Sequence, residues 1–315
     1  MTDTWDAWIS RLERDHSLLE PNRLRQRIEV LDRLESHPTW GAGRGGGADP
    51  RLSTELHDRI GLLYADLEAA NQRVYAAIRE AIQQGNGAQS LLEWAAAVGP
   101  VDDVRHRVDS DGYDGLDALL SGVLQIEEPS PEAQLAAEMV FYQPTPARHI
   151  FELIVRTGLS EHDVLVDLGS GLGHVPLLAA ICTRARCVGI EWQAAYVDCA
   201  RRCAKALNLA NVTFARQDAR AADLSSGTVF YLYTPFTGAM LDDVLAMLRR
   251  EAAAREIRIG TLAPCTANLA RDPWLERIGT AKPGGLVVFR SLDPAGPSCS
   301  ARGSRSVRLR RSRQR

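Results

Sequence analysis

The chain has 315 residues and a formal net charge of −3, with 45% hydrophobic and 24% charged residues. This is the composition of an ordinary globular protein, and the length allows one or two domains. No apolar run reaches the roughly 20 residues needed to cross a bilayer, and the N-terminus lacks the basic-then-apolar order of a secretory signal. We therefore expect a cytoplasmic protein without membrane attachment.

Charge is distributed unevenly along the chain. Residues 296–315 contain seven arginines and no acidic residue, so the remainder carries 30 basic against 40 acidic side chains, a balance of −10. A body this acidic repels a phosphate backbone, which argues against a nucleic-acid partner. Residues 293–315 are rich in Ser, Gly, Pro and Arg, and we expect them to form a disordered tail.

The cysteines indicate neither disulfides nor a metal site. They show no Cys-x-x-Cys pair and no Cys/His spacing typical of zinc. We expect reduced, mostly buried thiols and no bound metal. The six are Cys182, Cys187, Cys199, Cys203, Cys265 and Cys299.

A helical N-terminal region, residues 1–130, is predicted first. Its longest helix carries an apolar stripe at three- and four-residue steps, formed by Leu52, Leu56, Ile60, Leu63, Leu67, Val74 and Ile78. Glycines at 85 and 87 end this helix, a glycine-rich linker (41–47) precedes it, and Ser90 with Glu93 has the spacing of a capping box for the next helix. A stripe shows only that one face is buried, so the region is either a structural attachment, as we expect, or a substrate-recognition lid.

From 131 to 292 the pattern changes to alternating helices and strands. Proline and glycine frame two helices, expected at 130–140 and from Thr145 to Arg156. Strands are then predicted at 164–168, 187–190, 212–214, 229–233 and 257–262, with helices at 175–182, 194–207 and 238–254. Two final strands, 275–278 and 286–290, flank a Lys-Pro-Gly-Gly turn. The sequence thus predicts an α/β fold, a doubly wound seven-strand sheet with a C-terminal antiparallel hairpin, preceded by an α-helical N-terminal region.

A glycine-rich loop follows the first predicted strand and opens a helix. Its sequence is Asp167-Leu168-Gly169-Ser170-Gly171-Leu172-Gly173. Such a loop lets a ligand approach the backbone and the unpaired amides of a helix N-terminus. A dinucleotide-binding loop has glycines at its first, third and sixth positions, but counting from Gly169 the sixth position is His174. The spacing disfavours a nicotinamide cofactor, and we interpret His174 as the start of the helix rather than as a proton acceptor.

Two further acidic residues are expected at the carboxyl edge of the sheet, where open α/β sheets bind ligands. Glu191 ends the second strand, and Asp218 follows the third. With the glycine loop they give a pattern that resembles class I, seven-strand, Rossmann-like methyltransferases, from about 141 to 290. The resemblance implies S-adenosyl-L-methionine as cofactor, with Glu191 at the ribose and Asp218 and Ala219 at the adenine. It places the methionine end near Asp167, Gly169, Ser170, Gly171 and Gly173.

The segment Phe141-Tyr142-Gln143-Pro144-Thr145-Pro146 narrows the resemblance. It is similar to the segment that folds over the methionine end of the cofactor in protein-lysine methyltransferases, especially those of the disruptor-of-telomeric-silencing type and related mitochondrial enzymes. The resemblance implies that Tyr142 and Thr145 contact the cofactor. Thr145 also fits a second interpretation, as the N-cap of the helix that follows.

The segment after the fourth strand resembles the loop where this class meets its methyl acceptor. Adenine methyltransferases have Asn or Asp there, followed by two prolines and an aromatic residue, whereas this chain has Thr234 and a single proline. The resemblance implies methyl transfer to an amine, with protein lysine as one candidate, and Tyr233, Thr234 and Phe236 as the catalytic residues that orient it. A small-molecule or RNA methyltransferase, a nicotinamide oxidoreductase and a non-catalytic cofactor-binding protein stay open as alternatives.

Overall fold

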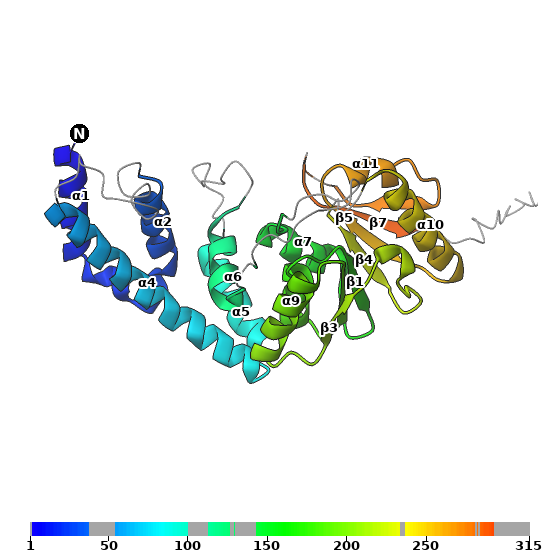
Figure 1. Cartoon of the computed structure of the whole chain (residues 1–315), viewed down its shortest axis with the longest axis horizontal. Helices are drawn as coiled ribbons and strands as arrows, with labels where there is room; N and C mark the ends of the chain where they lie inside the picture. Colours follow the sequence, from blue (N-terminus) through cyan, green and yellow to red (C-terminus); the bar gives the residue numbers. More distant parts are fainter. Residues whose placement is uncertain are drawn as a thin grey trace, which may run out of the picture.

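The computed structural model describes residues 2–37, 54–99, 113–126, 129, 143–233, 237–280, 282 and 284–292. Among them, helices cover both faces of a seven-stranded sheet, and a helical arm projects from one end of the molecule (Figure 1). The glycine-rich linker, the predicted helix at 130–140 and the tail from 293 lie outside the described residues. Within the described part, no helix is long and apolar enough to cross a membrane.

The sheet has the order β3-β2-β1-β4-β5-β7-β6. Its first five members run parallel, and β7 lies antiparallel between β5 and β6. The strands are β1 (Val164–Leu168), β2 (Arg186–Glu191), β3 (Val212–Arg216), β4 (Val229–Leu232), β5 (Arg258–Thr261), β6 (Leu275–Ile278) and β7 (Val287–Ser291). The predicted fold class is confirmed, including the C-terminal hairpin.

Two groups of helices bury the two faces of the sheet. One face packs against α7 (Ala147–Thr157), α8 (His174–Cys182) and α9 (Ala194–Ala206), and the other against α10 (Gly238–Ala254) and α11 (Cys265–Leu269). Successive side chains of a strand alternate between the faces. Leu165 and Tyr231 therefore belong to the first core, and Val166 and Phe230 to the second. Asp167 has the same parity as Leu165 and points toward the first group of helices.

The arm is built on one long helix, α4 (Thr54–Gln83), whose 30 residues span about 45 Å at the usual rise. Its outer half packs against α1 (Thr2–Arg14) and α2 (Leu24–Glu35) around a separate apolar cluster that includes Ile60 and Leu67. Short 3-10 helices, η1 (His16–Leu19) and η2 (Pro21–Arg23), join α1 to α2. The predicted apolar stripe therefore forms a helix that packs over most of its length.

The inner half of α4 shares a core with the sheet. It packs with α5 (Gly87–Val98) and α6 (Gly115–Leu124) in the same apolar cluster as α7, α8 and α9. The amide of Gln83 also donates to the carbonyl of Ala206 at 2.8 Å, and Asn208 donates to the carbonyl of Gln83 at 3.3 Å. The division into residues 1–130 and 131–292 stays a prediction, because its boundary lies outside the described residues.

One predicted helix cap is wrong. Asn86 is the cap residue of α5, so Ser90 and Glu93 lie inside that helix. The capping box of this region forms instead at the start of α6, where the Asp114 side chain accepts from the backbone and Asp117 accepts from the Asp114 amide. Of the described cysteines none forms a disulfide, and four of the five are buried.

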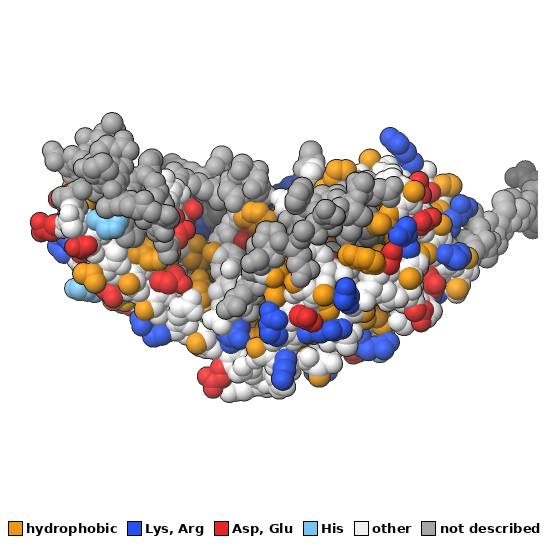
Figure 2. All heavy atoms as spheres, in the orientation of Figure 1, with side chains coloured by type: hydrophobic (Ala, Val, Ile, Leu, Met, Phe, Trp, Pro, Cys, Tyr) orange, Lys and Arg blue, Asp and Glu red, His pale blue; other side chains and the backbone are white. Residues whose placement is uncertain are grey.

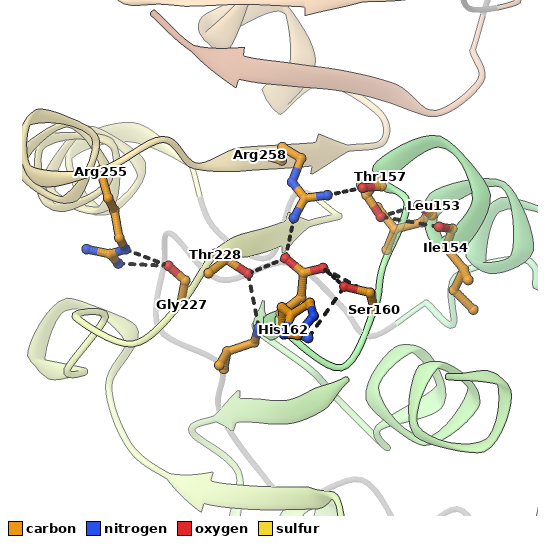
Figure 3. Close-up of polar contacts among 11 residues, drawn as sticks. Leu153, Ile154, Thr157, Ser160, His162, Gly227, Thr228, Arg255 and Arg258 are labelled. Carbon is orange, nitrogen blue, oxygen red and sulfur yellow. Dashed lines mark hydrogen bonds and ion pairs between the residues drawn. The ribbon is translucent and has the colours of Figure 1, made fainter. Parts of the chain in front are cut away.

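A polar cluster fastens the amino edge of the sheet (Figure 3). The Asp163 carboxylate accepts hydrogen bonds from the Ser160 amide and hydroxyl and from the Thr228 hydroxyl, and it forms an ion pair with Arg258. Arg258 also donates to the carbonyl of Thr157 at the end of α7. Burial raises the pKa of Asp163, but these hydrogen bonds and the guanidinium outweigh it and lower the pKa below its ordinary value. The cluster joins α7, β1, β4 and β5.

Candidate cofactor and acceptor site

The glycine loop lies at the opposite, carboxyl edge of the sheet, between β1 and α8. Gly169, Gly171 and Gly173 have φ angles of 85°, 52° and 85°, in the left-handed region that side chains disfavour. A Cβ on Gly173 would lie 2.7 Å from the Phe214 ring. The loop turns back onto β2, because the amides of Gly169 and Ser170 both donate to the carbonyl of Ile190, at 2.9 and 3.0 Å.

Glu191, the last residue of β2, holds this loop from the side. One carboxylate oxygen accepts from the Gly171 amide at 2.9 Å, and the other accepts from the Gln193 amide at 2.8 Å. Burial raises the pKa of Glu191, and the backbone hydrogen bonds partly oppose that rise. A carboxylate has about four acceptor positions on its two oxygens, so it can also accept from a ligand hydroxyl.

Asp167 is a second buried carboxyl group in this site, with only 3% of its surface exposed. Among the described residues, none donates a hydrogen bond to it. Burial raises its pKa well above the ordinary value, and the nearby charge of Glu191 raises it further. A buried carboxylate without a partner is unfavourable, so the site suits a ligand that brings hydrogen-bond donors or positive charge.

Thr145 is tied to the strand beside Asp167 through Tyr231. Its hydroxyl lies 3.1 Å from the Tyr231 hydroxyl, and Tyr231 is the strand partner of Asp167 across β1 and β4. The N-cap interpretation of Thr145 is wrong, because Pro146 is the cap residue of α7. The first amide of the helix, at Ala147, donates to the Asp117 carboxylate at 2.7 Å. Burial raises the pKa of Tyr231 well above its ordinary value, so it stays a neutral hydroxyl.

Ser170 and Asp218 differ in how their polar atoms are engaged. The Ser170 hydroxyl is buried and has no hydrogen-bond partner within the described part of the chain. Asp218 follows β3 and caps the short helix η4 (Ala219–Ala221), where it accepts from the Arg220 amide and forms an ion pair with the guanidinium. The hydrogen bond from Arg220 lowers the pKa of Asp218, although burial raises it slightly.

The acceptor loop is described only at its first residue. Tyr233 is half-buried and packs against the core that contains α7, α8 and α9. Thr234, Phe236 and Tyr142 lie outside the described residues, so their roles stay predictions. His174 begins α8 as expected, and burial lowers its pKa to about 4, which makes it a weak base.

Trp192 is a candidate site residue that the sequence analysis missed. It directly follows Glu191 at the carboxyl edge of β2, and 57% of its surface is exposed. A large exposed aromatic side chain beside a strand-end acidic residue is suited to stack on a flat ring. Its place in the sequence, next to Glu191, was a signal that could have been used. Among the described residues, no cluster of His, Cys, Asp or Glu is arranged to hold a metal ion.

One family model matches part of this chain. Residues 137–223 match the family model "Histone methylation protein DOT1". No curated protein is similar enough to this chain to count as a match.

Several solved structures resemble parts of the chain. An RNA methyltransferase from Salinibacter ruber, in complex with S-adenosyl-L-homocysteine, is 28% identical over 50% of this chain and 97% of its own, with a TM-score of 0.40. Precorrin-6y C5,15-methyltransferase from Geobacter metallireducens is 15% identical over 49% and 92%, with a TM-score of 0.38. Geranyl diphosphate C-methyltransferase from Streptomyces coelicolor is 22% identical over 36% and 42%, with a TM-score of 0.32.

The family match covers the glycine loop and both strand-end acidic residues. The sheet order places a reversed β7 between β5 and β6, as the resemblance to methyltransferases implied. The chain therefore has the fold of class I methyltransferases, and residues 137–223 of that fold match a family of histone-methylation proteins.

Proposed function

We propose that this methyltransferase acts on an amine, and that the amine is a lysine side chain of a protein. The observation that carries the cofactor part is the buried carboxyl of Asp167, which lies beside Glu191 and has no hydrogen-bond donor among the described residues. The acceptor part is supported by the family model, whose description is histone methylation. It is also supported by the neutral, aromatic character of the described acceptor end, Tyr231 and Tyr233.

The residues of the site fit S-adenosylmethionine. We assign Asp167 to the ammonium group of the methionine end and Glu191 to the ribose hydroxyls, which would give Asp167 a donor and add further donors to those that Glu191 already has. Gly169, Gly171 and Gly173 let the cofactor approach the loop backbone. The unpaired Ser170 hydroxyl offers one more hydrogen bond.

Asp218 and Ala219 are assigned to the adenine, as the resemblance implies. Asp218 already forms an ion pair with Arg220, so the backbone amide of Ala219 is the less encumbered contact. Tyr142 and Thr145 are assigned to the methionine end, with Thr145 fixed by its hydrogen bond to Tyr231.

Bound S-adenosylmethionine supplies an activated methyl group on a sulfonium centre. The residues of the chain then have to align a neutral amine in line with that methyl group and keep water out. Tyr233, Thr234 and Phe236 are assigned to this alignment, through aromatic faces and carbonyl oxygens. His174, with a pKa of about 4, does not hold the amine proton at neutral pH.

The cofactor assignment is tested by isothermal titration of S-adenosylmethionine and S-adenosylhomocysteine. We expect wild-type protein to bind both, and Asp167→Ala or Glu191→Ala to weaken binding by about 1–3 kcal/mol, the usual loss for a charged hydrogen bond. Folded wild-type protein that binds neither compound would remove the proposal.

The acceptor is tested with cofactor labelled in the methyl group and a cell lysate. Label that protease releases and nuclease does not, recovered as methyl-lysine after hydrolysis, supports a protein acceptor. Label released by nuclease, or found only among small molecules, would replace it with an RNA or small-molecule acceptor. Asp167→Asn protein serves as the control, and it should transfer far less label if the transfer depends on this site.

A further inference from the structure

A groove lies within the N-terminal helical region, between α2 and α6 on the side of α4 from which both rise (Figure 1). Its volume is about 1520 Å³. Small-molecule pockets usually measure about 300–1,000 Å³, so this groove is large enough for a segment of polypeptide. Tyr64 and Gln72 of α4 line it from below, α2 lines one side, and α6 lines the other.

Acidic side chains dominate the groove. The six that line it are Glu29, Asp32, Glu35, Glu68, Asp114 and Asp117, against Arg25 and Arg33. Arg25 already pairs with Glu29, and Arg33 lies 4.3 Å from the centre of the Trp8 ring. Asp32 is exposed and has no partner within the described part of the chain. Arg148, from outside the groove, lies 3.8 Å from Asp114. The acidic side chains of the lining still outnumber its cations by six to two.

The groove also contains an acceptor without a donor. Gln26 lines it, and the side-chain oxygen of Gln26 is buried without a hydrogen-bond partner among the described residues. A buried polar atom in this state is unusual, because it forgoes a hydrogen bond that water would supply. A ligand rich in N–H donors, as Lys and Arg side chains are, would satisfy this oxygen and the carboxylates together.

The surface of the catalytic domain has a different character. Figure 2 shows Lys and Arg side chains gathered over it, and α9 alone carries Arg201, Arg202 and Lys205. A positively charged ligand would be drawn to the groove and repelled from this face. A phosphate backbone would have the opposite preference.

Direct contacts connect the groove to the candidate acceptor site. Tyr113, which lines the groove, donates its hydroxyl hydrogen to the Pro144 carbonyl at 2.7 Å. The next residue, Thr145, reaches Tyr231 in the site. Asp117, also in the groove wall, accepts from the Ala147 amide at the start of α7. The α6 end of the groove thus adjoins the segment assigned to the methionine end of the cofactor.

From this arrangement we infer that the groove docks a Lys- and Arg-rich segment of the acceptor protein and so presents a nearby lysine to the methyl donor. The inference rests on the proposed protein acceptor and goes further, because it names where the acceptor binds and which chemistry selects it. Residues outside the cofactor site, on α2 and α4, then determine which proteins are methylated.

Fluorescence anisotropy with the full chain tests the inference directly. The probe is a labelled 14-residue peptide of alternating Arg, Gly, Lys and Ser, compared with a peptide in which Glu replaces Arg and Lys, and with a single-stranded RNA of 14 nucleotides. We expect the basic peptide to bind more tightly than the acidic peptide and the RNA, with an affinity that falls as salt rises. Equal binding of the acidic peptide, or stronger binding of the RNA, would overturn the inference.

Matched substitutions locate the binding site. The double variant Asp32→Asn with Glu68→Gln removes two charges from the groove, and Asp242→Asn with Asp243→Asn removes two exposed charges from α10. We expect the groove variant to weaken peptide binding roughly tenfold at low salt, because two charge contacts are lost together, and the α10 variant to change it less than twofold. Equal effects of both variants would mean non-specific attraction and would contradict a groove site.

Two further measurements separate this inference from the proposed function. The groove variant should keep wild-type affinity for S-adenosylmethionine, and a loss of cofactor binding would indicate that this variant is misfolded. In that case the single variant Asp32→Asn replaces it: weaker peptide binding by this variant supports the groove site, and unchanged binding contradicts it. If the wild-type chain methylates protein lysines but the groove variant methylates the same proteins equally well, the function stands and the docking inference fails. If only a chain lacking residues 296–315 binds the peptide, the arginine-rich tail is the occupant and the inference is wrong.

Discussion

Replacing Asp167 by asparagine should stabilise the protein while weakening its binding of S-adenosylmethionine. Asp167 is buried and receives no hydrogen bond from the described residues, and the Glu191 carboxylate lies close enough to raise its pKa further. Without cofactor, its charge is therefore a cost to the folded state. Asparagine keeps the shape of the side chain and removes that charge.

The size of this cost has an upper limit. A carboxyl group with an ordinary pKa of 3.8 can take up a proton at pH 7 for about 4 kcal/mol, at 1.36 kcal/mol per pH unit, so burial of the charge costs no more than that. The asparagine amide that replaces the carboxylate is also buried, and it destabilises the folded state by about 1–3 kcal/mol if it lacks hydrogen-bond partners. We expect a net gain of about 1–3 kcal/mol, and each kcal/mol raises Tm by roughly 2–4 °C in a domain of this size.

The gain should depend on pH in a defined direction. The pKa of Asp167 is higher in the folded state than in the unfolded state, so the folded protein binds this proton more tightly. The contribution of Asp167 to wild-type stability therefore becomes more favourable as pH falls from 7 toward 4, whereas the asparagine variant lacks this contribution. The difference between the two proteins is largest near neutral pH and disappears near pH 4.

Urea unfolding between pH 4 and pH 8, with calorimetric titration of S-adenosylmethionine, measures both effects. Loss of the charged contact should weaken cofactor binding about 10- to 150-fold, corresponding to 1.5–3 kcal/mol. Asp163→Asn is the matched control, because Asp163 lies just before the same strand but is fully partnered, by Ser160, Thr228 and Arg258. It should destabilise the protein by about 2–4 kcal/mol.

Asp167→Asn is expected to raise stability and Asp163→Asn to lower it, so the two variants together give a clear test. An Asp167→Asn protein that is less stable than wild type would show that the folded protein already stabilises the carboxylate. Unchanged cofactor affinity in a more stable variant would remove Asp167 from the binding site. Either outcome would refute the account of this carboxyl pair.

Four further substitutions test other parts of the structure. Tyr231→Phe and Thr145→Val should each cost about 1 kcal/mol of stability, and a double-mutant cycle should show that the pair acts through one hydrogen bond. Gly173→Ala should lower Tm by several degrees, because φ is +85° and a Cβ would meet the Phe214 ring at 2.7 Å; an unchanged Tm would mean that the loop relaxes easily. Arg27→Leu should destabilise the arm by about 2–4 kcal/mol, because the buried guanidinium donates hydrogen bonds to the carbonyls of Leu18 and Glu20. Denaturation followed by tryptophan fluorescence measures this loss, and a loss below 1 kcal/mol would contradict that role.

The sequence predicted the order of elements and the positions of the acidic residues at the sheet edge. Glycine at 169, 171 and 173 is required locally by left-handed backbone, and the short apolar runs of β1 and β4 have the composition of strands buried on both faces. These features depend on residues a few positions apart. They can therefore be detected in the sequence without knowledge of the distant contacts.

The sequence was less reliable for helix ends. Ser90 and Glu93 have the spacing of a capping box, but α5 starts at Gly87 because Asn86 ends the preceding turn. Threonine is a favoured N-cap residue, yet Pro146 rather than Thr145 takes that position. Asp117, 30 residues earlier, accepts the hydrogen bond from the Ala147 amide. Several nearby residues can serve as a cap, and packing selects among them.

Only the tertiary structure decided how the site is held and what surrounds it. The hydrogen bond between Thr145 and Tyr231 joins residues 86 positions apart, and Glu191 fixes the Gly171 amide from the neighbouring strand. The acidic groove forms because α2, α4 and α6 converge, although no segment of the arm carries a motif for binding. Local periodicity specifies which face of an element is buried, but the partner of that face is set by the packing of the whole chain.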